Sequence, residues 1–198
     1  MSVLVLTVDQ RGSRRSPDLV ADTVASLAGI ATLRAFEQTV GDEFQGVLDD
    51  PASLAPTVET LLRDGTWHLG IGAGEVEQPL PVHTRAGRGP AFVWAREAVT
   101  AAKSSPWHLR VCGDDPAARA LESTLWLWAA LLARRTARGW EVADLVAEGL
   151  SYDETATTLG ISPSAVSQRA QAAGIVESRR ARELVTDLAA RLLGKEPR

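Results

Sequence analysis

The stretch SYDETATTLGISPSAVSQRAQAAGI, residues 151–175, has the spacing of two short helices joined by a tight turn. Ser151 and Glu154 form a capping-box pattern, in which each side chain satisfies a free backbone N–H at the start of a helix. Gly160 suits the positive φ that ends many helices. Ser162 followed by Pro163 is then typical of the start of a second helix. The pattern therefore predicts a helix-turn-helix.

The second of these helices, predicted over 163–173, has an apolar face and a polar face. Val166 and Ala170 lie four residues apart and are expected to point to the core. The other side chains are small or polar, as a helix that enters the major groove of DNA requires. They are Ser164, Ala165, Ser167, Gln168, Arg169 and Gln171. The sequence predicts double-stranded DNA as a partner, although many ordinary corners between two helices look similar.

The charge of the chain limits how it can bind DNA. The 198 residues carry a net charge of −4, and the part from Asp114 onward holds 11 Lys and Arg against 12 Asp and Glu. A strongly basic DNA-binding protein would carry a clear excess of Lys and Arg, which this chain does not have. Contact must then use local charge from Arg169 and from Arg179, Arg180 and Arg182, which follow the second helix. Because a weakly basic protein needs a second copy to bind tightly, we expect a homodimer.

Composition narrows the class of protein further. An apolar content of 45% and a charged content of 23% are ordinary for a globular chain. The single cysteine, Cys112, rules out a disulfide framework or a Cys-rich zinc site within the chain. The first residues lack a basic segment and reach Asp9 quickly, as in a buried strand rather than a signal peptide. No apolar run is long enough to span a membrane. We expect a cytoplasmic protein that does not contact membranes.

The first part of the chain alternates between strand and helix patterns. The order β-α-β-β-α-β is typical of a ferredoxin-like domain. A change of composition at 113–116 precedes a segment with helical patterns only. We therefore predict an α+β protein with a ferredoxin-like domain over 1–113 and a helical helix-turn-helix domain over 116–198. The predicted elements are strands at 3–8, 32–39, 44–48, 67–76 and 109–112, and helices at 16–27, 51–62, 90–102, 117–135, 140–148 and 178–193.

Two further patterns allow more than one interpretation. Glycines inside the strand predicted at 67–76 usually mean that a ligand or another backbone comes close. The last predicted helix carries an apolar stripe that could pack on the body of the protein or on a second subunit. The stripe consists of Leu184, Val185, Leu188, Leu192 and Leu193.

Acidic residues lie at the end of the first predicted strand and at the tip of the predicted hairpin. In a ferredoxin-like sheet Asp9 and the pair Asp42 and Glu43 are expected to be neighbours. Paired carboxylates suit Mg²⁺, which shares its coordination with phosphate oxygens. The loop that follows Asp9 could bind phosphate through its backbone N–H groups and the positive charge of its arginines. That loop contains Gly12, Ser13, Arg14 and Arg15. The sequence thus predicts a Mg²⁺ and nucleotide site.

Several short motifs occur together along the chain. They are Asp9 followed by Gly12-Ser13-Arg14, GDEFQG at 41–46, GIGAGE at 70–75, GPAF at 89–92 and AREA at 95–98. The combination resembles the SatD family of small bacterial proteins, and the resemblance covers nearly the whole chain. Because members often end in a helix-turn-helix, it implies regulation and DNA binding.

More distantly, the first domain resembles the core of class III nucleotidyl cyclases and diguanylate cyclases. In that core a first-strand Asp and an acidic hairpin residue bind two metals that hold a nucleoside triphosphate, and Asp9 and Asp42 match them. Val93 and Glu97 stand where the core carries an Asn and an Arg. Phosphoryl transfer depends on positioning and charge neutralisation, which a Val and a Glu at these positions do not supply. We therefore expect that the first domain has no catalytic residues and is a degenerate sensor or a dimerisation module. A metal-dependent cyclase is the alternative, and a protein-docking helical domain, as in sigma factors, is a third.

Overall fold

Five strands form one mixed sheet in the computed structural model of the protein, which describes residues 1–63 and 65–196, the side chain of Arg14 excepted. The strands are β1 (Ser2–Gln10), β2 (Arg34–Gln38), β3 (Glu43–Leu48), β4 (Trp67–Glu75) and β5 (Leu109–Cys112). Their order is β2-β3-β1-β4-β5, and all neighbours are antiparallel except β4 and β5, which are parallel.

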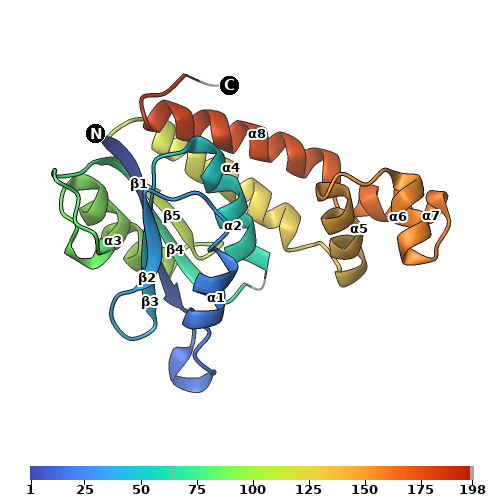
Figure 1. Ribbon diagram of the computed structural model, residues 1–198, viewed down its shortest axis with the longest axis horizontal. Coiled ribbons are helices and arrows are strands. Elements are labelled where there is room, and N and C mark those ends of the chain that lie inside the picture. The colour runs from blue at the N-terminus through green and yellow to red at the C-terminus, as the bar shows by residue number, and fades with distance from the viewer. Residues whose placement is uncertain (64, 197–198) are drawn as a thin grey trace.

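Eight α-helices accompany the sheet in the described part of the chain, so the predicted α+β class is confirmed. They are α1 (Val20–Ser26), α2 (Leu54–Arg63), α3 (Pro90–Ala102), α4 (Ala117–Leu132), α5 (Ala137–Ala147), α6 (Tyr152–Leu159), α7 (Pro163–Ala172) and α8 (Ile175–Leu192). Figure 1 shows α3 on one side of the sheet, α2 on the other, and α4 and α8 extending together toward α5, α6 and α7 at the far end of the molecule.

The glycines of β4 allow α3 to lie directly on the sheet. A Cβ at Gly70 would come within 2.2 Å of the Val99 backbone nitrogen, and a Cβ at Gly72 within 2.1 Å of the Ala91 carbonyl oxygen. The sequence left open whether a ligand or another backbone comes close to these strand glycines. At Gly70 and Gly72 it is the backbone of α3. Val3 and Val5 of β1 are fully buried in the apolar cluster on this face.

The opposite face of the sheet shares its core with the C-terminal helices. Leu4, Leu6 and Val8 of β1 belong to one apolar cluster with Trp128 of α4 and Val185 of α8. The boundary predicted at 113–116 therefore does not separate two hydrophobic cores. We call the sheet with α1–α4 and α8 the body, and residues 137–172, which form α5, α6 and α7, the head.

The apolar stripe of α8 is used mainly inside the molecule. Val185, Leu192 and Leu193 are buried, and Leu188 packs partly buried against the same cluster. Leu184 remains 47% exposed. Packing on the body thus accounts for most of the stripe.

Helix α1 begins at Val20, later than the predicted start at 16, and a buried glutamine binds the residues that precede it. Gln10 is 2% exposed, donates from Nε2 to the Pro17 carbonyl at 2.6 Å, and accepts the Leu19 N–H at 3.0 Å. Asp18 then accepts the Val20 N–H at 2.9 Å. These bonds fix the path of the chain that leads into α1.

Candidate functional site

The head has a small apolar core of its own. Val142 of α5, Ala156 of α6, and Val166 and Ala170 of α7 are buried against one another, and Ile161 in the turn packs partly buried on them. The two positions predicted to face the core of the second helix therefore do so. A three-helix core of this kind fixes the angle at which α7 is presented.

The predicted caps are present at both helices of the motif. The Ser151 N–H donates to Glu154 Oε2 at 2.8 Å, and the Glu154 N–H donates to Ser151 Oγ at 3.3 Å. Gly160 ends α6 with a φ of 64°. Ser162 accepts the Ala165 N–H at 3.2 Å at the start of α7. Each cap satisfies a backbone group that the helix itself leaves free.

One face of α7 is an exposed polar stripe. Apart from Pro163 at the first position, the exposed residues of α7 follow the spacing i, i+3, i+4, i+7 and i+8 and include no charged residue: Ser164, Ser167, Gln168, Gln171 and Ala172. Ala165 is half-buried beside the stripe. Arg169 is also half-buried, and its Nη1 lies 3.9 Å from Glu141 Oε2 of α5. Arg169 therefore stands at the edge of the stripe rather than at its centre.

The arginines at the start of α8 divide into two groups. Arg179 and Arg180 are exposed, and Arg180 makes a 2.8 Å ion pair with Glu183 that is open to solvent and easily exchanged. Arg182 turns inward and donates from Nε to Glu59 Oε2 at 2.9 Å. The prediction that Arg182 adds to a basic cluster is therefore wrong, because α2 supplies its partner.

Charge in and beside the head is balanced. Residues 134–180 contain six arginines and six carboxylates. Several of these charges are already paired in the structure, among them Arg169 with Glu141 and Asp144 with Arg63 of the body. A large positive field around α7 is therefore lacking.

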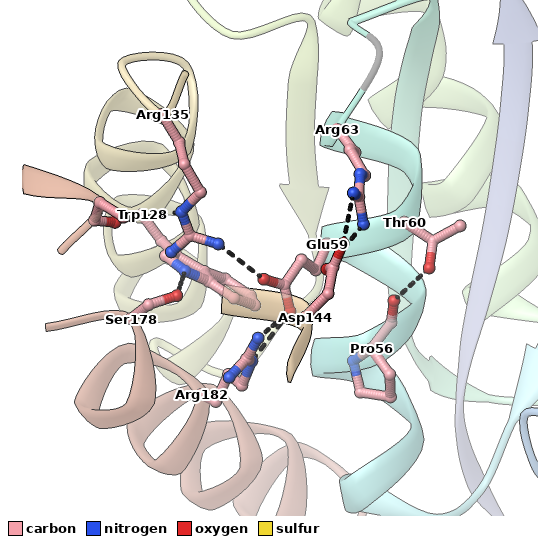
Figure 2. A network of polar contacts seen from close by, with 10 residues as sticks. Pro56, Glu59, Thr60, Arg63, Trp128, Arg135, Asp144, Ser178 and Arg182 are labelled. Carbon is pink, nitrogen blue, oxygen red and sulfur yellow. Dashed lines mark hydrogen bonds and ion pairs between the residues drawn. The ribbon is translucent and has the colours of Figure 1, made fainter. Parts of the chain in front are cut away.

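A polar network joins the head to the body (Figure 2). Glu59 of α2 accepts from Arg182 of α8, and its Oε1 lies 3.5 Å from Arg135 Nη1. Arg135 donates from Nε to the Ala173 carbonyl, directly after α7, at 3.0 Å. Burial lowers the pKa of the Arg135 guanidinium, and the Glu59 carboxylate partly offsets this. Arg135 therefore holds the end of α7 and the body at the same time.

An aromatic ring lies between the two sides of this joint. Trp140 of α5 lies under two guanidinium groups, 4.4 Å from that of Arg63 and 4.3 Å from that of Arg135, measured to the ring centroid. Arg63 also forms a two-pronged pair with Asp144 at 2.7 and 2.9 Å. The sequence reasoning missed this joint because its members lie far apart along the chain.

The predicted metal ligands are brought together only in part. Asp9 and Glu43 are direct partners across β1 and β3, and the Asp42 carbonyl accepts the Gln10 N–H at 3.1 Å. The Asp9 carboxylate lies 3.1 Å from Lys103 Nζ at the end of α3. Within residues 1–63 and 65–196, His, Cys, Asp and Glu form no group of three or more that could hold a metal ion. A carboxylate that is already neutralised fits a resident Mg²⁺ poorly, so the metal site stays a prediction.

The predicted phosphate loop is a tight turn that follows directly after β1. Gly12 has a φ of 66°, and Ser13–Arg15 forms a single 3-10 turn closed by the Arg15 N–H to the Gly12 carbonyl at 2.8 Å. Arg15 is exposed, and the side chain of Arg14 lies outside the described part of the chain. The structure shows no cavity at this loop among those found in the described residues.

Two histidines meet near the same end of β1. His68 is the partner of Asp9 across β1 and β4, and its ring lies 5.0 Å from that of His108, between centroids. Burial, followed by repulsion from the other histidine, lowers the pKa of His68. Burial and the charge of Arg11 lower that of His108. Both rings are therefore held in the neutral form more strongly than a free histidine would be.

Comparison with protein-family models, curated proteins and solved structures finds no match to this chain. Function is therefore inferred from the geometry of the chain itself. None of the helices in the described part of the chain combines the length and apolar character that crossing a bilayer requires.

Proposed function

We propose that this protein is a DNA-binding transcriptional regulator and that α7 enters the major groove. The observation that carries the proposal is the exposed, uncharged polar stripe of α7, presented by a capped three-helix unit at the far end of the molecule (Figure 1). Glutamine and serine side chains can read base edges and phosphates at this spacing. We assign base contact to Gln168 and Gln171, with Arg169 at the rim of the interface.

The balanced charge of the head supports action as a homodimer. Phosphate neutralisation supplies most of the affinity of a protein for DNA. One copy offers few arginines directly after α7, namely the exposed Arg179 and Arg180, whose pair with Glu183 is open to solvent. Two copies on neighbouring half-sites double the contact without any new residue.

For the body we propose a ferredoxin-like domain that acts as a sensor or dimerisation module. The antiparallel order β2-β3-β1-β4 over residues 1–75 supports the ferredoxin-like interpretation, with β5 added in parallel at the edge. Membership of the SatD family and a cytoplasmic location are parts of the same proposal. The motif order and the composition of the sequence support them.

The proposal is tested by gel shift with fragments of the source genome and excess non-specific competitor. The double variant Gln168→Ala, Gln171→Ala is expected to weaken specific binding by about 10-fold or more, since one lost base contact costs about 1–3 kcal/mol. Arg179→Ala is expected to reduce the salt dependence by about one unit of slope. Thr158→Ala, on the exposed face of α6, is the matched control.

Two results would contradict the DNA-binding proposal. The first is that no fragment binds above the competitor. The second is that the double variant of Gln168 and Gln171 binds as tightly as Thr158→Ala. Recovery of RNA polymerase in a pull-down without DNA would instead favour the protein-docking alternative.

A metal-dependent nucleotidyl cyclase is a second candidate, favoured by the pairing of Asp9 with Glu43 across neighbouring strands. The ion pair from Lys103 to Asp9 and the exposed Val93 in α3 count against it. The test is product formation from ATP or GTP with Mg²⁺ or Mn²⁺. Activity that Asp42→Ala abolishes would support the enzyme.

A further inference from the structure

A pocket of about 960 Å³ opens at the start of α3. Its walls are the loop between β4 and α3, the first turns of α3 and one residue of β3. It lies at the opposite end of α3 from Lys103 and Asp9, and a helix of 13 residues spans roughly 20 Å. Most of the pocket is therefore distant from the predicted metal site, and only Gln45 brings its wall within two residues of Glu43.

Three arginines face this pocket without a carboxylate partner. Arg85, Arg88 and Arg96 line it, and none of them makes an ion pair with any described residue. Two carboxylates, Glu77 and Glu97, also line it, and neither is paired there. Three arginines against two carboxylates leave the lining with an excess of one positive charge. The planar guanidinium groups are donors suited to an anion.

The start of α3 forms part of the same wall, and the Phe92 and Val93 N–H groups there donate to the Gly89 carbonyl at 3.1 and 3.3 Å. Gly89 is the N-cap of α3 with a φ of 119°, and no side chain caps the helix. A Cβ at Gly89 would lie 2.8 Å from Val76 Cα, so the chain passes closely here only with glycine. What this end of the 13-residue helix contributes is the partial positive charge of the helix dipole rather than free N–H groups.

One buried polar side chain forms part of the pocket wall. Gln45 of β3 is only 4% exposed, and its Nε2 donates to Thr7 Oγ1 at 2.8 Å. The bond to Thr7 fixes this side chain in the wall of the pocket.

Two aromatic side chains give the pocket an apolar wall and are fixed by glycines. A Cβ at Gly87 would lie 2.0 Å from the ring of Phe92, and a Cβ at Gly74 would lie 2.3 Å from the ring of Trp94. Each ring therefore rests directly on backbone. The part of the β4–α3 loop that contains Arg85 is also held in place, because the Arg85 backbone N–H donates to Glu37 Oε1 at 3.3 Å.

We propose that this pocket binds a small phosphate-bearing molecule with a flat apolar group. The phosphate lies between the guanidiniums of Arg88 and Arg96 and the start of α3. The flat group lies against Phe92 and Trp94. The two negative charges of a phosphate match this set of donors better than the single charge of a carboxylate does.

Isothermal titration of the full chain, without DNA, tests the proposal with naphthyl phosphate as the probe. We expect saturable binding of one probe per chain, tighter than that of naphthol or of inorganic phosphate. Arg88→Ala and Arg96→Ala are each expected to weaken it by about 10-fold, because charge-assisted hydrogen bonds are lost. Arg138→Ala removes an exposed, unpaired arginine of α5 and is the matched control.

Circular dichroism shows whether each variant is folded, so that a loss of binding can be assigned to the pocket. Unsaturable binding, or equal binding by both pocket variants and the control, would overturn the proposal. Naphthoate binding as tightly as naphthyl phosphate would overturn the assignment to phosphate. Because the measurement contains no DNA and leaves α7 unchanged, its failure is distinguishable from a failure of DNA binding.

Discussion

Gly70 and Gly72 control the distance between α3 and β4 through a single missing carbon atom each. The atoms that an added Cβ would meet belong to the backbone of α3, which cannot rotate away as a side chain can. The helix and the strand would have to separate, and the buried contacts between them would weaken.

Gly72→Ala is therefore expected to lower the free energy of unfolding by at least about 1–3 kcal/mol, the usual cost of overpacking a core. Urea unfolding measures the change. Gly29→Ala is the control, because no heavy atom lies within 4 Å of a Cβ built there. We expect the control to change stability by less than about 0.5 kcal/mol. Equal effects of the two substitutions would contradict the close packing of α3 on β4.

The half-buried pair His68 and His108 makes stability depend on pH. Both pKa values are lowered in the folded protein, so the unfolded chain, with values of about 6.5, binds more protons over the range between them. The stability that the folded protein gains from keeping both histidines neutral is fully present above about pH 6.5 and is lost as the pH falls below it. The Asp9 carboxylate opposes this lowering at His68, while the positive charges of Arg11 and Lys103 act in the same direction as burial.

Urea unfolding at about pH 7.5 and at about pH 5.5 measures this dependence. The native protein is expected to be less stable at the lower pH. In the double variant His68→Gln, His108→Gln the difference between the two conditions is expected to shrink. An unchanged difference would show that other groups are responsible.

At the scale of the element, α7 depends on its first residue. Ser162 supplies the side-chain acceptor for the Ala165 N–H, and Pro163 at the next position needs no partner for its nitrogen. Only ten residues make up the helix, so its local stability is small without the cap and the packing of Val166.

Ser162→Ala is expected to destabilise α7 by about 1 kcal/mol, the typical cost of a lost N-cap. Faster hydrogen exchange at the first amides of α7 measures this directly. Ser123→Ala, an exposed serine inside α4 that is not a cap, is the control and is expected to leave exchange in α7 unchanged. Equal exchange rates in the two variants would mean that packing alone holds α7.

The elements of the head could be predicted from the sequence because their determinants are local. Ser151, Gly160 and Ser162 each act on backbone within a few residues, so spacing alone indicates where α6 and α7 begin and end. The pairing of Asp9 with Glu43 was also predictable, since the expected sheet order places the first strand beside the hairpin. The start of α1 was not, because it depends on the buried side chain of Gln10.

At the scale of the whole molecule, the joint between head and body could not be predicted. Glu59 and Arg182 are separated by 123 positions, and no local pattern connects them. The pocket at the start of α3 was missed for a similar reason. The arginines of the loop at 77–89 were visible in the sequence, but their lack of partners is a property of the folded chain.

Glu59→Gln leaves the buried Arg135 without a charged partner and weakens the hold on Arg182. Breaking a buried ion pair costs on the order of 3 kcal/mol, and urea unfolding is expected to show a loss of that size. Arg63→Ala is the contrasting variant. Its pair with Asp144 is nearly half exposed, so the expected loss is about 1 kcal/mol or less. Equal losses would contradict the central place of Glu59.

The path of the chain through the joint has a consequence for protein engineering. The chain leaves the body at the end of α4 and returns at Gly174, where an added Cβ would lie 2.5 Å from the side chain of Leu131. The exit and entry points are therefore adjacent, and the head is an insertion within a helical hairpin. A short linker could close this gap, so that the body is produced alone or fitted with the head of another protein, which would exchange the DNA specificity that we propose for α7.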